Sequence, residues 1–345
     1  MKVTALIGAG MVARTHVAAC AAASKTLRLK GILSRDSDKA GILAQEASGC
    51  TGSDIAVYDS IDQLAADAEV DFAIVATPPN VRAEVIAPLV AAGKHILLEK
   101  PIGRTCDEAR AIVAMCCDAG VTLGIVFQHR ARVASTTAAS MIKSGQFGEL
   151  GLAEFDVSWW REQSYYDEPG RGSYARDGGG VLISQAIHTI DLGLSLTGPV
   201  RSVLAMARTT RFHRMESEDF VVAALEFDNG AVGSLKASTA SFPGRAETIT
   251  LYFEKATLHL EAGQLQINWR DAKTETFGEE TSTGGGADPM AFTHEWHQQI
   301  FENFANALGK NEEPMASGLQ ALAAHELIDA TIRSAKSGTT HYLQK

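Results

Sequence analysis

The segment 178–191 combines a flexible backbone with side chains that could move a proton. Three glycines, Gly178–Gly180, come first, and glycine is favoured where the backbone must bend or approach another group closely. Apolar residues then recur at helical spacing, which predicts that Ser184, His188 and Asp191 share one helical face. His188 could act as a general acid or base near neutral pH, and the alternative is a buried structural histidine near a helix N-terminus. Asp191, one turn on, could orient His188, and the alternative is a structural acid of the helix.

A lysine at the end of an apolar strand is the second candidate for chemistry. Residues 95–98 are predicted to form this strand, and Glu99-Lys100-Pro101 follows. In an open α/β sheet, ligands bind beyond the carboxyl ends of the strands. Lys100 is therefore expected to face the cofactor and substrate, and Pro101 makes a cis peptide bond possible.

A dinucleotide-binding turn is predicted near the N-terminus. Residues 8–13 fit G-x-G-x-x-A and lie between a strand at 3–7 and a helix to about residue 23, with a second strand at 27–33. Gly8 allows the tight turn, Gly10 lets a pyrophosphate approach the backbone, and Ala13 lets the helix pack closely on the strand.

The end of the second strand bears on the choice of cofactor. NAD-binding proteins usually place an acid there for the adenosine ribose, but this chain has Ser34 and Arg35. Both side chains suit a 2′-phosphate, so the sequence favours NADP(H) over NAD(H). The alternative is that Arg35 is a solvated charge and that Asp36 caps a helix.

The first part of the chain alternates short apolar strands with helices. Further strands are predicted at 56–58, 70–76 and 121–126, and helices at 60–66, 80–92 and 106–118. This alternation is typical of a parallel sheet covered on both faces. We expect an α/β Rossmann domain over residues 1–125.

The remainder, residues 126–345, is predicted to be an α+β domain with a large, mostly antiparallel open sheet. A helix at 133–143 and a strand at 152–160 precede a polar, aromatic loop at 161–177, and two helices, from about 292 and 318, end the chain. The first of these helices has an apolar core stripe at Phe292, Trp296, Ile300, Phe304 and Leu308. Residues 272–290 are predicted to be a loop. The strands are expected at about 200–209, 218–227, 231–239, 246–253, 256–261 and 264–269.

Length, charge and cysteines narrow the class of protein. A chain of 345 residues suggests two domains. A formal net charge of −10 disfavours nucleic-acid binding and binding to anionic membranes. The five cysteines are scattered without a C-x-x-C pair, as in reduced cytoplasmic proteins. His294 and His297 lack the spacing of the H-E-x-x-H zinc motif, so no metal site is predicted.

Four motifs together resemble the glucose–fructose oxidoreductase, inositol dehydrogenase and rhizopine-catabolism family, called Gfo/Idh/MocA. They are residues 8–13, residues 76–80, residues 92–101 and the segment 178–191. The resemblance implies that Lys100 and His188 contact the reacting hydroxyl or carbonyl. Many members of the family have an aspartate where this chain has Ser184, which cannot serve as an acid or base at neutral pH.

These features predict an NAD(P)-dependent oxidoreductase acting on a secondary alcohol or ketone of a sugar, polyol or cyclic diol. The family resemblance also implies a homodimer or homotetramer formed through the open sheet face. Alternatives are a cofactor-retaining glycosidase of the same family and a non-catalytic nucleotide sensor. The predicted cofactor-binding residues are Gly8, Gly10, Met11, Val12, Ser34, Arg35, Thr77, Pro78, Asn80, Glu99 and Lys100. The predicted substrate-binding residues are Arg130, Arg171, Ser184, Gln185 and His188.

Overall fold

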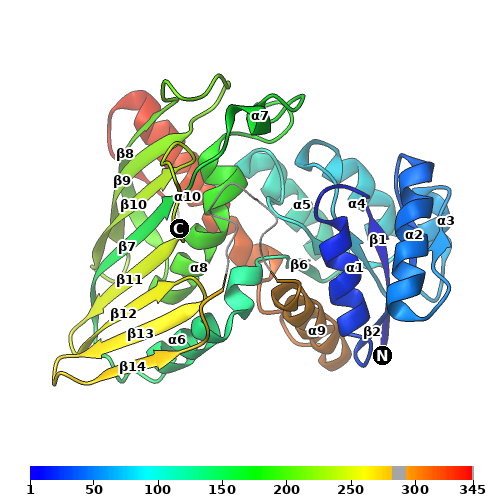
Figure 1. Cartoon of the computed structure of the whole chain (residues 1–345), viewed down its shortest axis with the longest axis horizontal. Coiled ribbons are helices and arrows are strands. Elements are labelled where there is room, and N and C mark those ends of the chain that lie inside the picture. The colour runs from blue at the N-terminus through cyan, green and yellow to red at the C-terminus, as the bar shows by residue number, and fades with distance from the viewer. Residues whose placement is uncertain (282–292, 344–345) are drawn as a thin grey trace. The chain divides into compact units, whose positions relative to one another are not determined.

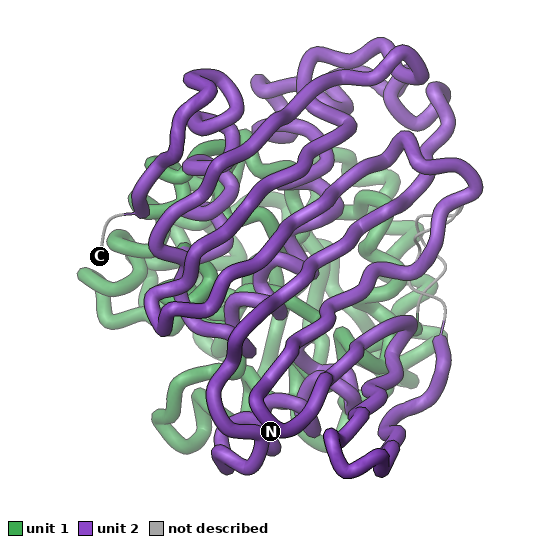
Figure 2. The backbone as a smooth tube through the Cα atoms, turned by 90° about the vertical axis from the view of Figure 1, so that its left-hand side faces the viewer, with its two compact units in different colours: residues 1–128, 293–322 green, residues 129–292, 323–345 purple. Residues whose placement is uncertain are grey.

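The computed structural model describes residues 1–281 and 293–343, and the chain forms two compact units (Figure 2). Unit 1 contains residues 1–128 and 293–322, and unit 2 contains residues 129–292 and 323–345. The first boundary lies three residues from the predicted one at 125/126. The predicted second domain differs from unit 2, because residues 293–322 return to unit 1.

Unit 1 is built on a six-stranded parallel sheet, as predicted. Its central strands are largely apolar, because both faces of a parallel sheet are covered. The 3-2-1-4-5-6 order is the Rossmann order. Across the sheet the strands are β3 (Ala56–Val57), β2 (Leu27–Leu33), β1 (Lys2–Ile7), β4 (Phe72–Val75), β5 (His95–Leu98) and β6 (Leu123–Ile125).

The helices of unit 1 begin in two ways. Three begin at side-chain caps: Asp36, Ser60 and Thr105 each accept the backbone N–H three residues on. The helix that follows the glycine turn, α1 (Ala13–Ala22), has neither a side-chain cap nor an acid in its first turn. The others are α2 (Ser37–Thr51), α3 (Ile61–Ala66), α4 (Arg82–Ala91) and α5 (Cys106–Asp118).

The returning segment completes the core of unit 1. Its helix α9 (Glu295–Lys310) packs Phe304 against Phe72 of β4, with ring centroids 5.2 Å apart. Beyond the helix, the backbone carbonyl of Ala316 accepts a hydrogen bond from the N–H of Ile125. The apolar stripe predicted on this helix is buried at Trp296, Ile300 and Phe304. This stripe needs apolar cover, and unit 1 provides it at Phe72.

Unit 2 contains a nine-stranded sheet that is antiparallel throughout except for one parallel pair, β7 with β10. The predicted mostly antiparallel sheet is therefore confirmed. In order the strands are β14 (Thr274–Phe277), β13 (Gln264–Trp269), β12 (Ala256–Glu261), β11 (Thr248–Phe253), β7 (Leu150–Ser158), β10 (Val232–Ser238), β9 (Phe220–Phe227), β8 (Val200–Arg208) and β15 (His341–Tyr342).

Two predicted loops contain regular structure. The loop at 161–177 includes a short helix, α7 (Gln163–Tyr166). Part of the loop at 272–290 forms β14, because Thr274 and its neighbours pair with β13. Residues 282–290 of that loop and Phe292 of the predicted helical stripe lie outside the described residues. The short edge strand β15 was not predicted.

One face of this sheet packs against helices and the other carries exposed apolar side chains. Within unit 2, α6 (Val133–Lys143), α8 (Ile187–Thr197) and the later part of α10 (Gly318–Ser337) lie along one face (Figure 1). The opposite face of the sheet is turned toward the viewer in Figure 2. Met206 and Val222, which are paired across β8 and β9, are exposed apolar side chains of the sheet. No helix among residues 1–281 and 293–343 is long and apolar enough to cross a membrane.

The packing of α9 on β4 generates a stability prediction. Phe304→Ala is expected to lower the free energy of unfolding by about 3–5 kcal/mol, because it leaves a cavity against Phe72. Denaturant unfolding measures this change. The matched control is Leu319→Ala, at an exposed position, which should change stability by no more than about 0.5 kcal/mol. A cost for Phe304→Ala as small as that of the control would contradict the assignment of α9 to the core.

Candidate active site

In the glycine turn after β1, packing within the protein requires a glycine at Gly8 but not at Gly10. Gly8 has φ +112°, and a Cβ there would lie 2.7 Å from the Ala76 carbonyl oxygen. At Gly10 a Cβ would meet no atom within 4 Å. Packing therefore does not explain Gly10. Val12, the residue before α1, gives the helix no side-chain cap, and Met11 is exposed, so these residues suit an anionic pyrophosphate.

The end of β4 carries a buried hydroxyl oxygen that has no partner among the described residues, Thr77 Oγ1. Such a group normally has a hydrogen-bond partner, so a polar ligand atom would satisfy it. Pro78 and Asn80 follow, exposed at the start of a 3₁₀ turn (Pro79–Val81). All three were predicted to bind the cofactor, and they lie together at the carboxyl edge of the sheet.

At the end of β2 the structure gives Asp36 a structural role. Its side chain accepts the N–H of Lys39 and caps α2. The Ser34 hydroxyl accepts the N–H of Asp36 at 3.3 Å, and Arg35 is exposed. Asp36 is thus used as a cap, while Ser34 and Arg35 are the polar groups at the position where an acid usually contacts the ribose.

Lys100 has a firmly held main chain. The Lys100–Pro101 peptide bond is cis. The N–H of Lys100 donates to Glu99 Oε2 at 3.1 Å, and its carbonyl accepts from Arg82 Nη2 at 3.3 Å. Arg82 also donates twice to the Thr77 carbonyl, at 3.0 and 2.9 Å. The buried Arg82 therefore ties the ends of β4 and β5 together.

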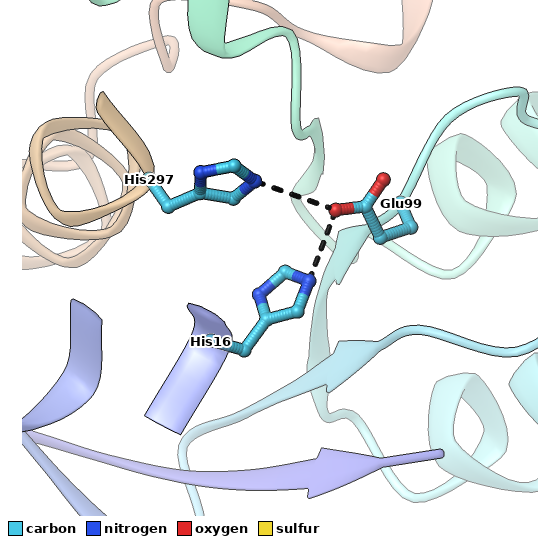
Figure 3. A group of neighbouring side chains, drawn as sticks. All are labelled: His16, Glu99 and His297. Atoms are coloured by element: carbon cyan, nitrogen blue, oxygen red, sulfur yellow. Dashed lines mark hydrogen bonds and ion pairs between the residues drawn. The ribbon is translucent and has the colours of Figure 1, made fainter. Parts of the chain in front are cut away.

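Glu99 belongs to a buried group with two histidines (Figure 3). His16 Nε2 lies 2.9 Å from Glu99 Oε1, and His297 Nε2 lies 3.8 Å from the same oxygen. Burial by itself raises the pKa of Glu99. The hydrogen bond from His16 and the neighbouring positive charge outweigh burial and bring the pKa down to about 2. Burial lowers the pKa of His297 to about 3. At neutral pH the group therefore holds a carboxylate beside a neutral His297.

In unit 2 the segment before His188 departs from the predicted helix. Residues Leu182–Ala186 form a π-helix, and α8 begins only at Ile187. A π turn contains more residues than an α turn. The prediction that Ser184, His188 and Asp191 follow one regular helical face is corrected accordingly. Such turns occur frequently at functional sites.

The glycines before the π-helix have a packing reason that sequence analysis missed. A Cβ at Gly180 would lie 1.8 Å from the Glu218 carbonyl oxygen, so only glycine fits. The buried Glu218 carboxylate accepts the N–H groups of Gly180 and Leu182 at 3.3 and 3.2 Å. Burial raises the pKa of Glu218. Glu218 thereby holds the start of the segment that leads to His188.

His188 is buried in unit 2 and stacks on His129, with ring centroids 4.8 Å apart. The proposed orienting residue, Asp191, is engaged elsewhere. Both of its oxygens accept from Arg130, at 2.7 Å each. These contacts fit a structural role for Asp191. They also engage two nitrogens of Arg130, which was predicted to bind the substrate.

The other predicted substrate ligands include a cluster around Tyr165. The guanidinium of Arg171 lies 4.5 Å from the ring centroid of Tyr165 and pairs with Glu168. Gln185 Nε2 donates to the Tyr165 hydroxyl at 3.3 Å, while the buried Gln185 Oε1 has no partner in the described part of the chain. Ser184 is half-buried on the π-helix.

Four residues of these sites were missed or given no role by sequence analysis: His16, Arg82, Glu218 and His297. Only His16 had a local signal, since it follows Ala13 by three residues and lies one helical turn beyond the glycine motif. Arg82 and Glu218 are charged residues in otherwise ordinary surroundings. The position of His297 depends on the return of α9 to unit 1.

Both parts of the chain resemble known oxidoreductase domains. Residues 2–127 match the model of an oxidoreductase family with an NAD-binding Rossmann fold, and residues 135–259 match the GFO/IDH/MocA C-terminal domain. An uncharacterised oxidoreductase of Schizosaccharomyces pombe is 31% identical over 50% of this chain and 47% of its own length. The alignment thus spans about half the length of that relative.

Two further relatives are similar over most of their length. D-xylose 1-dehydrogenase (NADP(+)) 2 of Haloferax volcanii is 26% identical over 89% of each chain. The WlbA dehydrogenase from Bordetella pertussis, solved with NADH and UDP-GlcNAcA, is 28% identical, with complete coverage of both chains and a TM-score of 0.80. Both domain models and the two-part fold lead to one conclusion: the chain belongs to the Gfo/Idh/MocA family of oxidoreductases.

Proposed function

We propose that this protein is a nicotinamide-dependent oxidoreductase that interconverts a secondary alcohol and a ketone on a sugar, polyol or cyclic diol. The observation that carries the proposal is the carboxyl edge of the unit 1 sheet. There an uncapped helix start, the orphaned Thr77 hydroxyl and a tightly held Lys100 follow the adjacent strands β1, β4 and β5. Such an edge binds an anionic dinucleotide and presents a cation beside it.

The side chains divide the chemistry between charge and proton. The bound nicotinamide supplies or accepts the hydride. The Lys100 ammonium stabilises the developing alkoxide during oxidation and polarises the carbonyl in the reverse direction. His188 accepts the hydroxyl proton as general base. Ser184 replaces an acid, so proton transfer is assigned to His188 alone.

The family and the polar cluster in unit 2 support the proposed substrate class. Relatives act on D-xylose or were solved with a nucleotide sugar, and hydroxyl-rich ligands need several convergent polar groups. Arg130, Arg171, Ser184 and Gln185 remain our proposed substrate ligands. We propose a cytoplasmic protein that dimerises through the exposed face of the nine-stranded sheet.

Turnover tests the two assigned roles. Lys100→Ala and His188→Ala are each expected to lower kcat by about 10²–10⁴, because each removes charge stabilisation or proton transfer. A screen over sugars, sugar acids and cyclic diols, followed by the absorbance of reduced nicotinamide, provides the assay. The exposed Lys25→Ala variant is the control.

Unchanged turnover in either site variant would contradict that residue's assigned role. Substrate cleavage without a net change in nicotinamide absorbance would instead identify a glycosidase that retains its cofactor. Binding of nucleotide with no turnover of any compound in the screen would favour a sensor.

Cofactor preference rests on Ser34 and Arg35. We propose that NADP(H) binds more tightly than NAD(H), because a guanidinium that pairs with the 2′-phosphate contributes about 1.5–3 kcal/mol. Arg35→Ala should therefore weaken NADPH binding by about 10- to 100-fold and affect NADH little, as measured by titration of intrinsic fluorescence. Arg28→Ala is the control, because Arg28 lies within β2, before the strand end that carries Arg35, and pairs with Glu69. Tighter binding of NADH to the unaltered protein would refute the preference.

Dimerisation through the sheet face can be tested at Val222. Val222→Lys is expected to shift the protein toward monomer in analytical ultracentrifugation, because it buries a charge in an apolar interface. Ile42→Lys, an exposed apolar position in α2 of unit 1, is the control. An unaltered dimer in the Val222 variant would exclude this face as the interface.

A further inference from the structure

We propose that the Glu99 carboxylate, which His16 holds in place, positions Lys100 for the reaction together with Arg82, which binds the Lys100 carbonyl. This inference rests on the proposed role of Lys100 and extends it to residues that need not touch the substrate. It concerns unit 1 alone, where α1, α4, β5 and α9 bring these side chains together.

Glu99 is a buried carboxylate whose two oxygens have different partners. Oε1 faces His16 Nε2 at 2.9 Å, and Oε2 accepts the N–H of Lys100 at 3.1 Å. A buried charge is tolerated only when it is well hydrogen-bonded. The interaction with His16 therefore sets the orientation of the carboxylate, and the carboxylate in turn fixes the Lys100 peptide.

Arg82 holds the other side of the same residue. Its guanidinium is buried and donates to the carbonyls of Thr77 and Lys100. Burial lowers the pKa of Arg82 to about 10, and the charge of Glu99 opposes that shift. The Lys100 N–H and carbonyl are thus held by a buried anion and a buried cation. These contacts fix the position of the backbone from which the Lys100 side chain extends.

His297 closes the group from the returning helix. Its ring meets that of His16 edge-on at a centroid distance of 5.3 Å, and Phe301 of the same helix stacks on His16. His297 is 1% exposed in its side chain and neutral at pH 7. We infer that α9 keeps water away from Glu99, which strengthens the hydrogen bonds of the carboxylate.

A metal site formed by His16, Glu99 and His297 is the competing interpretation, and the contacts favour hydrogen bonding. A carboxylate only accepts, so His16 Nε2 carries the proton and donates. A metal on Nε2 would move that proton to Nδ1, which is buried without a partner in the described residues. Metal-bound histidines almost always donate their second N–H to a neighbouring acceptor.

The central test replaces the carboxylate with its isostere. Glu99→Gln is expected to lower kcat by about tenfold to hundredfold, since misplacing a reacting group by about 1 Å costs up to about 10². Glu99 was predicted to bind the cofactor, but both of its oxygens are engaged by His16 and the Lys100 N–H, so KM and the nucleotide dissociation constant should change little. The alkaline limb of the pH profile should move to lower pH, because a negative charge near the Lys100 ammonium is removed.

Two further comparisons separate positioning from general destabilisation. His16→Gln, which retains an N–H donor, should keep more activity than His16→Leu. Phe304→Leu loosens the packing of α9 without changing the partners of Glu99, so it should lower the melting temperature while leaving kcat and the pH profile unaltered.

A readout without substrate keeps the inference separate from the proposed function. Lysines are dimethylated with a ¹³C label, and Lys100→Arg identifies the Lys100 resonance. In Glu99→Gln its titration midpoint should fall, because the negative charge of Glu99 is removed. An unmoved midpoint, together with unchanged kcat, would overturn the positioning role even if Lys100→Ala abolished turnover.

If Lys100→Ala retained full turnover while the Lys100 midpoint still moved in Glu99→Gln, the coupling between the two residues would stand and the catalytic proposal would fail. Co²⁺ absorption bands that require both His16 and His297 would overturn the hydrogen-bonded interpretation.

Discussion

The buried carboxylate of Glu99 joins parts of unit 1 that are far apart in the sequence. His16 comes from the helix after the glycine turn, Lys100 from the strand end, and His297 from a helix almost 200 residues later. An ionised carboxylate in an apolar interior is stable only when donors surround it. The position of Lys100 therefore depends on the packing of α1, α9 and the parallel sheet around one charge.

Unit 2 uses a steric constraint for a similar purpose. Gly180 lies against the Glu218 backbone at a distance that no side chain would permit. The Glu218 carboxylate then receives two N–H groups from the same segment, and the following five residues form a π-helix before His188. The pairing of Arg130 with Asp191 anchors the next turn. The segment that carries the proposed general base is thus held by buried charges on both sides.

The relatives place these constraints in a wider context. Complete coverage and a TM-score of 0.80 at 28% identity to the WlbA dehydrogenase show that the fold persists while most side chains change. A parallel sheet with ligands at its carboxyl edge tolerates such change, because the site lies on strand ends and loops. Ser184 lies on the π-helix of unit 2 and cannot serve as an acid or base at neutral pH, which leaves His188 as the proposed base.

The sequence alone was sufficient for the local and periodic features. Apolar runs and glycine signals predicted both sheets, β5 and α5 to the residue, and the contribution of Lys100 to the carboxyl edge. The apolar stripe on α9 showed that this helix is buried. These features depend on neighbours in the chain, so a single sequence contains them.

Only the tertiary structure decided which element the α9 stripe packs against, and hence that His297 lies beside Glu99 and His16. It also showed that Asp191 pairs with Arg130, and that Gly180 is glycine because Glu218 lies against it. The physical reason is the same in each case. The partner of a buried charge, and the atom that excludes a Cβ, come from residues distant in sequence, and no local periodicity records them.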